Sequence, residues 1–161
     1  MKKIYLAAIL FVGVVIACNN NPSSDTKTDT AAKTTAEEEE ASSNGVSNDP
    51  KGIGKYKNVT LDHPLDQEKV KTGNDVYNVK CSSCHKLTDE RLVGPGWKDV
   101  TKRRTPEWIM NFVTNTEEMV QRDTAAQKLL EVCLVQMPNQ NLSEADARGV
   151  LEFMRKNDGE K

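Results

Sequence analysis

The reactive chemistry of this chain is concentrated in five consecutive residues, Cys81-Ser82-Ser83-Cys84-His85. Two thiols separated by two residues and followed at once by an imidazole suit thioether attachment of both vinyl groups of a haem, with the histidine as an iron ligand. The motif therefore predicts one covalent haem c, attached at Cys81 and Cys84, whose iron is bound by His85.

Two other uses of paired cysteines fit the sequence less well. A zinc site would need two further ligands, and Cys133 and His63 do not form a second paired motif. A thioredoxin-like redox pair lies beside a βαβ pattern, which is missing around these cysteines. His63 is also a possible haem ligand, but its place before Pro64 favours a surface loop.

The N-terminus has the features of an exported protein. Residues 1–17 combine a positive start with an apolar run that is too short for a transmembrane helix and typical of a signal peptide. The run ends in Val15-Ile16-Ala17-Cys18, which resembles a bacterial lipobox, so we expect Cys18 to be acylated and to anchor the chain. An ordinary signal peptide, or an uncleaved anchor with an incidental cysteine, is the alternative.

Composition divides the mature chain into two parts. Residues 18–50 carry almost no large apolar side chain and include the run Glu37–Glu40, so we expect a disordered polar tether after the acylated cysteine. Residues 51–161 hold both tryptophans and form the predicted domain. Basic and acidic residues nearly balance in that domain, which argues against a nucleic-acid-binding face.

Helix signals place the haem motif in an all-α domain. Asp66 can cap a helix that continues to Lys80, and Ser143 can cap a final helix. Thr105-Pro106 can begin another helix, and one more is expected from about Asp123. We expect the first and last helices to cross.

The spacing of several motifs resembles a class I c-type cytochrome with one haem, in its lipoprotein-anchored bacterial form. The motifs are Gly73-x-x-x-Tyr77-x-x-x-Cys81-x-x-Cys84-His85, Val93-Gly94-Pro95-Gly96-Trp97, Met137-Pro138 and Val150-x-x-Phe153. The resemblance covers residues 66–158. It implies four to five helices around one haem, with Gly73 at the crossing of the terminal helices and Tyr77 against Val150 and Phe153.

Site residues follow from the same resemblance. The carbonyl of Pro95 is expected to accept a hydrogen bond from His85, which fixes the imidazole tautomer. Met137, in an irregular segment before the final helix, is expected to supply the second axial ligand through its thioether. Trp97 and Trp108 are candidates for contact with the porphyrin or its propionates, although buried packing alone would explain either. Cys133 could pair between molecules or act in redox chemistry, but its place on an apolar helix face favours a buried, inert thiol.

The expected function is one-electron transfer by a carrier, not an enzyme, at the extracytoplasmic side of the cell envelope. The resemblance suggests redox protein partners such as respiratory complexes, with a terminal oxidase or a nitrous oxide reductase as possible acceptors. A haem enzyme or ligand sensor in which Met137 leaves the iron is the alternative.

Basic side chains flank the haem-binding segments, namely Lys80, Lys86, Lys98, Lys102, Arg103 and Arg104. A positive ring around an exposed haem edge would steer an acidic partner. Ordinary solvated charge explains the same residues equally well, so the sequence leaves both interpretations open.

Overall fold

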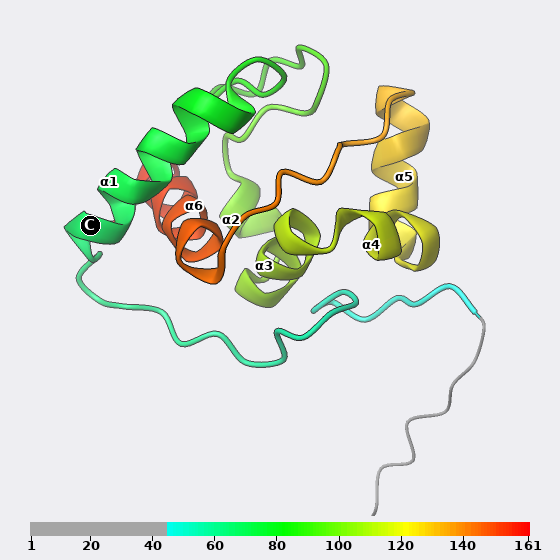
Figure 1. Ribbon diagram of the computed structural model, residues 1–161, viewed down its shortest axis with the longest axis horizontal. Helices are drawn as coiled ribbons and strands as arrows, with labels where there is room; N and C mark the ends of the chain where they lie inside the picture. The colour runs from blue at the N-terminus through cyan, green and yellow to red at the C-terminus, as the bar shows by residue number, and fades with distance from the viewer. Residues whose placement is uncertain (1–44) are drawn as a thin grey trace, which may run out of the picture. The chain divides into compact units, whose positions relative to one another are not determined.

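The computed structural model describes residues 45–161 (Figure 1). The predicted signal peptide 1–17, the lipidation site Cys18 and most of the predicted tether lie outside the described residues. None of the described helices has both the length and the apolar character needed to cross a membrane.

The described residues fold into six α-helices and contain no β-strand, which confirms the predicted all-α class. The elements are α1 (Gln67–Val76), a π-helical turn η1 (Tyr77–Cys81), α2 (Val100–Arg103), α3 (Pro106–Thr114), α4 (Thr116–Arg122), α5 (Thr124–Cys133) and α6 (Glu144–Asn157). The short helices α2 and α4 were not predicted, because neither is long enough to show a clear apolar period.

Each predicted helix start has its expected cap. The Asp66 carboxylate accepts from the backbone N–H groups of Glu68 and Lys69, and the Thr105 hydroxyl accepts from that of Trp108. Ser143 and Asp146 form a reciprocal capping box at the start of α6. These caps satisfy N–H groups that have no partner inside their own helix.

The first helix changes its winding before the haem motif. The α-helical part ends at Val76 instead of reaching Lys80, and a π-turn carries the chain to Cys81. The backbone N–H of Ser82 bonds to the carbonyl of Tyr77, five residues earlier, at 2.9 Å. The wider turn buries Tyr77 and Cys81 at the point where the haem motif begins.

Helices α1 and α6 cross and pack against each other (Figure 1). A Cβ added to Gly73 would lie 1.9 Å from the carbonyl oxygen of Gly149, so only glycine permits this approach. The rings of Tyr77 and Phe153 pack beside the crossing with centroids 5.5 Å apart. The predicted crossing and its Gly73 contact are confirmed.

An extended strap, residues 46–65, runs from α5 to the start of α1 and packs on α3 and α4. Ser47, which lies within the predicted tether 18–50, exchanges backbone hydrogen bonds with Arg122 and Thr124. The fully buried Asn111 side chain of α3 bonds to the backbone N–H and carbonyl of Tyr56. The packed domain therefore begins a few residues before Lys51.

Charged groups fasten the end of the strap to α6. The guanidinium of Arg155, 1% exposed, pairs with the buried Glu152 at 2.6 Å and donates to the backbone carbonyl of Asp62. The Asp62 carboxylate in turn pairs with Lys69 and Arg148. Arg155 and Glu152 are both buried, and their attraction to each other offsets the cost of removing the two charges from water.

Candidate haem-binding site

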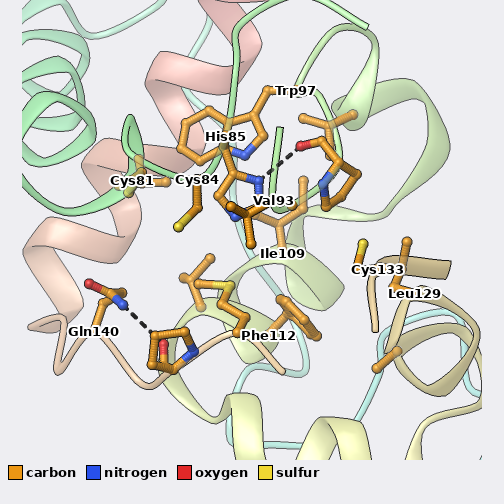
Figure 2. A pocket seen from close by; sticks show the side chains of 18 of the residues that line it. Cys81, Cys84, His85, Val93, Trp97, Ile109, Phe112, Leu129, Cys133 and Gln140 are labelled. Carbon is orange, nitrogen blue, oxygen red and sulfur yellow. Dashed lines mark hydrogen bonds between the residues drawn. The ribbon is translucent and has the colours of Figure 1, made fainter. Parts of the chain in front are cut away.

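A cavity of about 500 Å³ lies between the haem motif, α3, α5 and the segment that precedes α6. Most of its wall is apolar. The cavity gathers almost every site residue that the sequence predicted, namely Cys81, Cys84, His85, Pro95, Trp97, Trp108 and Met137. Figure 2 shows Cys84 and His85 on one side of the cavity and Ile109 and Phe112 of α3 on another.

The imidazole of His85 is held in one orientation. Its Nδ1 lies 2.9 Å from the carbonyl oxygen of Pro95, the predicted partner, which leaves Nε2 available as a metal ligand (Figure 2). Burial lowers the pKa of His85 from its ordinary 6.5, and the bond to Pro95 opposes this shift. The neutral form that binds a metal is therefore favoured.

Glycine at position 94 permits this arrangement. A Cβ there would lie 2.3 Å from Cε1 of the His85 ring. The backbone N–H groups of Val93 and Gly94 both donate to the carbonyl of Cys84, so this segment runs directly beside the haem motif. On the other side, the Tyr77 hydroxyl donates to the His85 carbonyl at 2.8 Å.

The two thiols of the motif have different surroundings. Cys81 is buried, and burial raises the pKa of its thiol to about 11. Cys84 is half-buried, and both residues line the cavity. Both sulfurs are free, as thioether attachment of a haem requires.

Met137 reaches the cavity from a loop between α5 and α6. Leu134, with a left-handed φ of 59°, ends α5 and turns the chain towards this loop. The Lys80 ammonium donates to the carbonyl of Gln140 at 3.1 Å and joins the loop to the haem motif. The loop therefore brings Met137 to the same cavity as His85, although 51 residues lie between them in the sequence.

The two tryptophans have different roles in the wall. Trp97 is buried beside His85, with ring centroids 5.7 Å apart. Trp108 also lines the cavity, but its indole N–H donates to the Asp123 carboxylate at 3.1 Å. That N–H has its partner inside the protein, so Trp108 contributes a ring face to the cavity and not the propionate hydrogen bond considered above.

Arg104 is a site residue whose role the sequence did not predict. Its guanidinium lies over the Trp108 ring, 4.6 Å from the centroid, and lines the cavity. Within residues 45–161 it forms no ion pair with a carboxylate. A guanidinium in this position suits the carboxylate of a haem propionate. The sequence placed Arg104 only in a run of basic residues, and nothing there distinguished it.

Two further predictions have clear outcomes. Cys133 is partly exposed and lines the cavity, so the prediction of a fully buried thiol was wrong. The reason is that Cys133 is the last residue of α5, where the helix reaches the cavity edge. His63 is exposed beside Arg155, away from the cavity, as expected of a surface loop histidine.

These residues fit a covalent haem better than a bare metal ion. The wall is apolar, two thiols are adjacent, and one imidazole nitrogen remains free beside a thioether. No group of three or more His, Cys, Asp or Glu side chains in the described part of the chain could hold a metal ion. The fold and the site together define a small helical protein with a covalent haem site.

The chain belongs to the cytochrome c family, whose model matches residues 70–158. The cytochrome c from Rhodothermus marinus is similar, with 38% identity, a TM-score of 0.64, and coverage of 68% of this chain and 93% of that one. An engineered cytochrome c from Rhodothermus marinus is 36% identical, with a TM-score of 0.64 and coverage of 68% and 98%. The same engineered protein bound to a carbene intermediate has a TM-score of 0.61. No curated protein matches the chain. Membership implies one covalent haem c and haem-based electron transfer.

Proposed function

We propose that this protein is a membrane-tethered, single-haem electron carrier that shuttles electrons between respiratory complexes or periplasmic reductases. The observation that carries the proposal is the convergence of His85 and Met137 on one apolar cavity beside Cys81 and Cys84. Haem c bound there supplies an iron that accepts and returns one electron. The protein's part is to hold the axial ligands and to exclude water.

The two axial groups favour a carrier. His85 offers Nε2 as one ligand, and Met137 is the proposed second ligand, through its sulfur. If both residues bound the haem iron, they would leave it no site for oxygen or peroxide. The thioether would also favour the reduced state and raise the reduction potential of the haem.

The mouth of the cavity carries a surface suited to a protein partner. We define the apolar rim as the exposed residues Val79, Leu92, Val93, Val132, Leu134 and Val135. Val79, Val93 and Val135 line the cavity, Leu92 and Leu134 adjoin two of these in sequence, and Val132 precedes the cavity residue Cys133. Arg91 donates to the carbonyl of Val132 at 2.6 Å, which joins two segments of the rim. Exposed apolar surface at a functional site marks an interaction surface.

Three of the six basic residues that flank the haem-binding segments have an acidic partner within the protein. Lys86 pairs with Glu90 at 3.3 Å, Lys98 with Asp89 at 3.8 Å and Lys102 with Asp99 at 2.6 Å. Intramolecular partners weaken the field that these cations present to another protein. We therefore propose that the redox partner docks mainly through apolar contact.

The proposed location is the extracytoplasmic face of a membrane, through lipid on Cys18. Support comes from the short apolar run and the lipobox in the sequence. The proposed acceptors are a terminal oxidase or a nitrous oxide reductase, with a quinol-oxidising complex as a candidate donor.

The alternative is a haem enzyme or sensor in which Met137 leaves the iron. An engineered relative from Rhodothermus marinus is bound to a carbene intermediate, so a related haem site can accept a small group. The alternative and the carrier differ in whether Met137 binds the iron in the resting protein.

Optical spectra of the haem-loaded protein separate the two functions. A carrier gives a low-spin spectrum with a thioether-to-iron band, and Met137→Ala converts it to a high-spin spectrum. Met110→Ala, which alters a buried methionine of α3, is the matched control and should keep the low-spin form. A high-spin resting spectrum of the unchanged protein would favour the enzyme or sensor.

A further inference from the structure

Asp123 is a buried carboxylate directly behind the wall of the haem cavity. It is 1% exposed, and its Oδ1 accepts hydrogen bonds from Trp108 Nε1 at 3.1 Å and from the backbone N–H of Ala126 at 2.8 Å. Trp108 and Ala126 both line the cavity. One layer of residues therefore separates the carboxylate from the cavity.

Asp123 and Glu152 are the two buried carboxylates of the described residues, and only Glu152 has cationic partners. Glu152 is paired with Arg148 and Arg155, at 2.7 Å and 2.6 Å. Asp123 forms no ion pair in residues 45–161. Both hydrogen bonds to its side chain come from neutral N–H donors, so neither donor cancels a carboxylate charge.

Arg104, a cation in the cavity wall, lies on another side of Trp108. Arg104 covers the face of the Trp108 ring, while Asp123 bonds to the N–H at the ring edge. The two charges do not form an ion pair, and Arg104 lines the cavity, where it is available to a haem carboxylate. The charge of Asp123 is therefore left to act through the low-dielectric wall.

We propose that Asp123 is a positioning residue for Trp108 that also sets the reduction potential of the site through its negative charge. A fixed negative charge near the iron stabilises the oxidised state, which carries one more positive charge than the reduced state. The carboxylate thus lowers the potential that the Met137 thioether raises. This inference rests on the proposed electron-transfer function, but it concerns the potential and not the partner.

Asp123→Asn is the decisive variant. Asparagine keeps a carbonyl oxygen for Trp108 and Ala126 and is an equally good helix N-cap, so it removes the charge and preserves the geometry. At an ambient potential equal to the midpoint of the unchanged protein, we expect the ratio of reduced to oxidised haem protein to rise roughly threefold or more. The rise should persist in high salt, because a buried charge is poorly screened.

Glu117→Gln is the matched control. It removes the same unit of charge from an exposed residue of the neighbouring helix α4, and we expect almost no change in the ratio. An Asp123→Asn ratio equal to that of Glu117→Gln, with native tryptophan fluorescence, would overturn the proposal.

Trp108→Phe provides a second test that does not depend on the stability of the first variant. It breaks the hydrogen bond to Asp123 but keeps the carboxylate, so the ratio of reduced to oxidised protein should stay close to that of the unchanged protein. A rise in Trp108→Phe equal to the rise in Asp123→Asn would show that the hydrogen bond and not the charge sets the ratio, and would contradict the proposal. The spectra that report binding of Met137 to the iron are recorded separately from the ratio. Failure of the proposed carrier function can therefore be distinguished from failure of the inference about Asp123.

Discussion

Gly73 of α1 and Gly149 of α6 are in backbone contact, because a Cβ on Gly73 would lie 1.9 Å from the Gly149 carbonyl oxygen. The contact sets the distance between α1, which leads into the haem motif, and α6, which contributes Val150 and Met154 to the cavity wall. Tyr77 and Phe153 pack beside it and support the start of the haem motif.

Gly73→Ala should therefore destabilise the haem-loaded protein. The added methyl group cannot be accommodated without separating the helices, and overpacking of this kind costs about 1–3 kcal/mol or more. Urea unfolding monitored by circular dichroism measures the loss. Lys71→Ala, on the exposed face of the same helix, should change the free energy of unfolding by about 0.5 kcal/mol or less.

The contribution of the Asp62 ion pairs to the stability of the fold should depend on pH. The hydrogen bond from the Lys69 side chain, followed by the charges of Lys69 and Arg148, holds the pKa of Asp62 below its ordinary 3.8. A lowered carboxyl pKa stabilises the fold above pH 3.8, and this contribution is lost as the pH falls through the folded-state value.

Asp62→Asn should accordingly reduce stability at pH 7 and reduce it less at pH 3, which lies below the ordinary pKa of 3.8. Urea midpoints at the two pH values measure the difference. Asp89→Asn, an exposed carboxylate outside the strap, is the control. An equal loss at both pH values would show that the carboxylate charge is not what fastens the strap.

The apolar rim should control electron transfer between protein molecules. Because the natural partner is unidentified, the probe is electron self-exchange between oxidised and reduced copies, measured by NMR. Leu134→Ser with Val135→Ser should slow self-exchange several-fold with little dependence on salt, since neither change alters charge. Val46→Ser, at an exposed apolar residue that does not line the cavity, should leave the rate unchanged.

The basic residues should affect the self-exchange rate much less than the apolar rim does. Lys98, Lys102 and Arg103 changed together to alanine should alter self-exchange only slightly, because Lys98 and Lys102 already pair with Asp89 and Asp99. A large change that disappears in high salt would instead support the positive ring.

Covalent haem attachment should require two of the three described cysteines. Cys81→Ser and Cys84→Ser should each remove one thioether, since each sulfur lines the cavity within the haem motif. Cys133→Ser should retain haem and the native optical spectrum. Mass spectrometry of peptides after expression with a cytochrome assembly system measures the attachment, and loss of haem from Cys133→Ser would give that thiol a role in assembly.

Much of the site could be predicted from the sequence because its chemistry is local. Cys81, Cys84 and His85 are adjacent, and the glycine and proline positions beside His85 follow within ten residues. Helix caps such as Asp66 and Ser143 also act within one turn, so residue type alone indicates them.

The tertiary structure decided which distant groups share a wall and which charges have partners. The sequence could not show that Trp108 donates to Asp123, that Arg104 has no carboxylate partner among the described residues, or that Cys133 reaches the cavity edge. These properties depend on how α3, α4 and α5 pack together. Burial and pairing arise only when separate helices meet, whereas the haem motif is complete within a single turn of the chain.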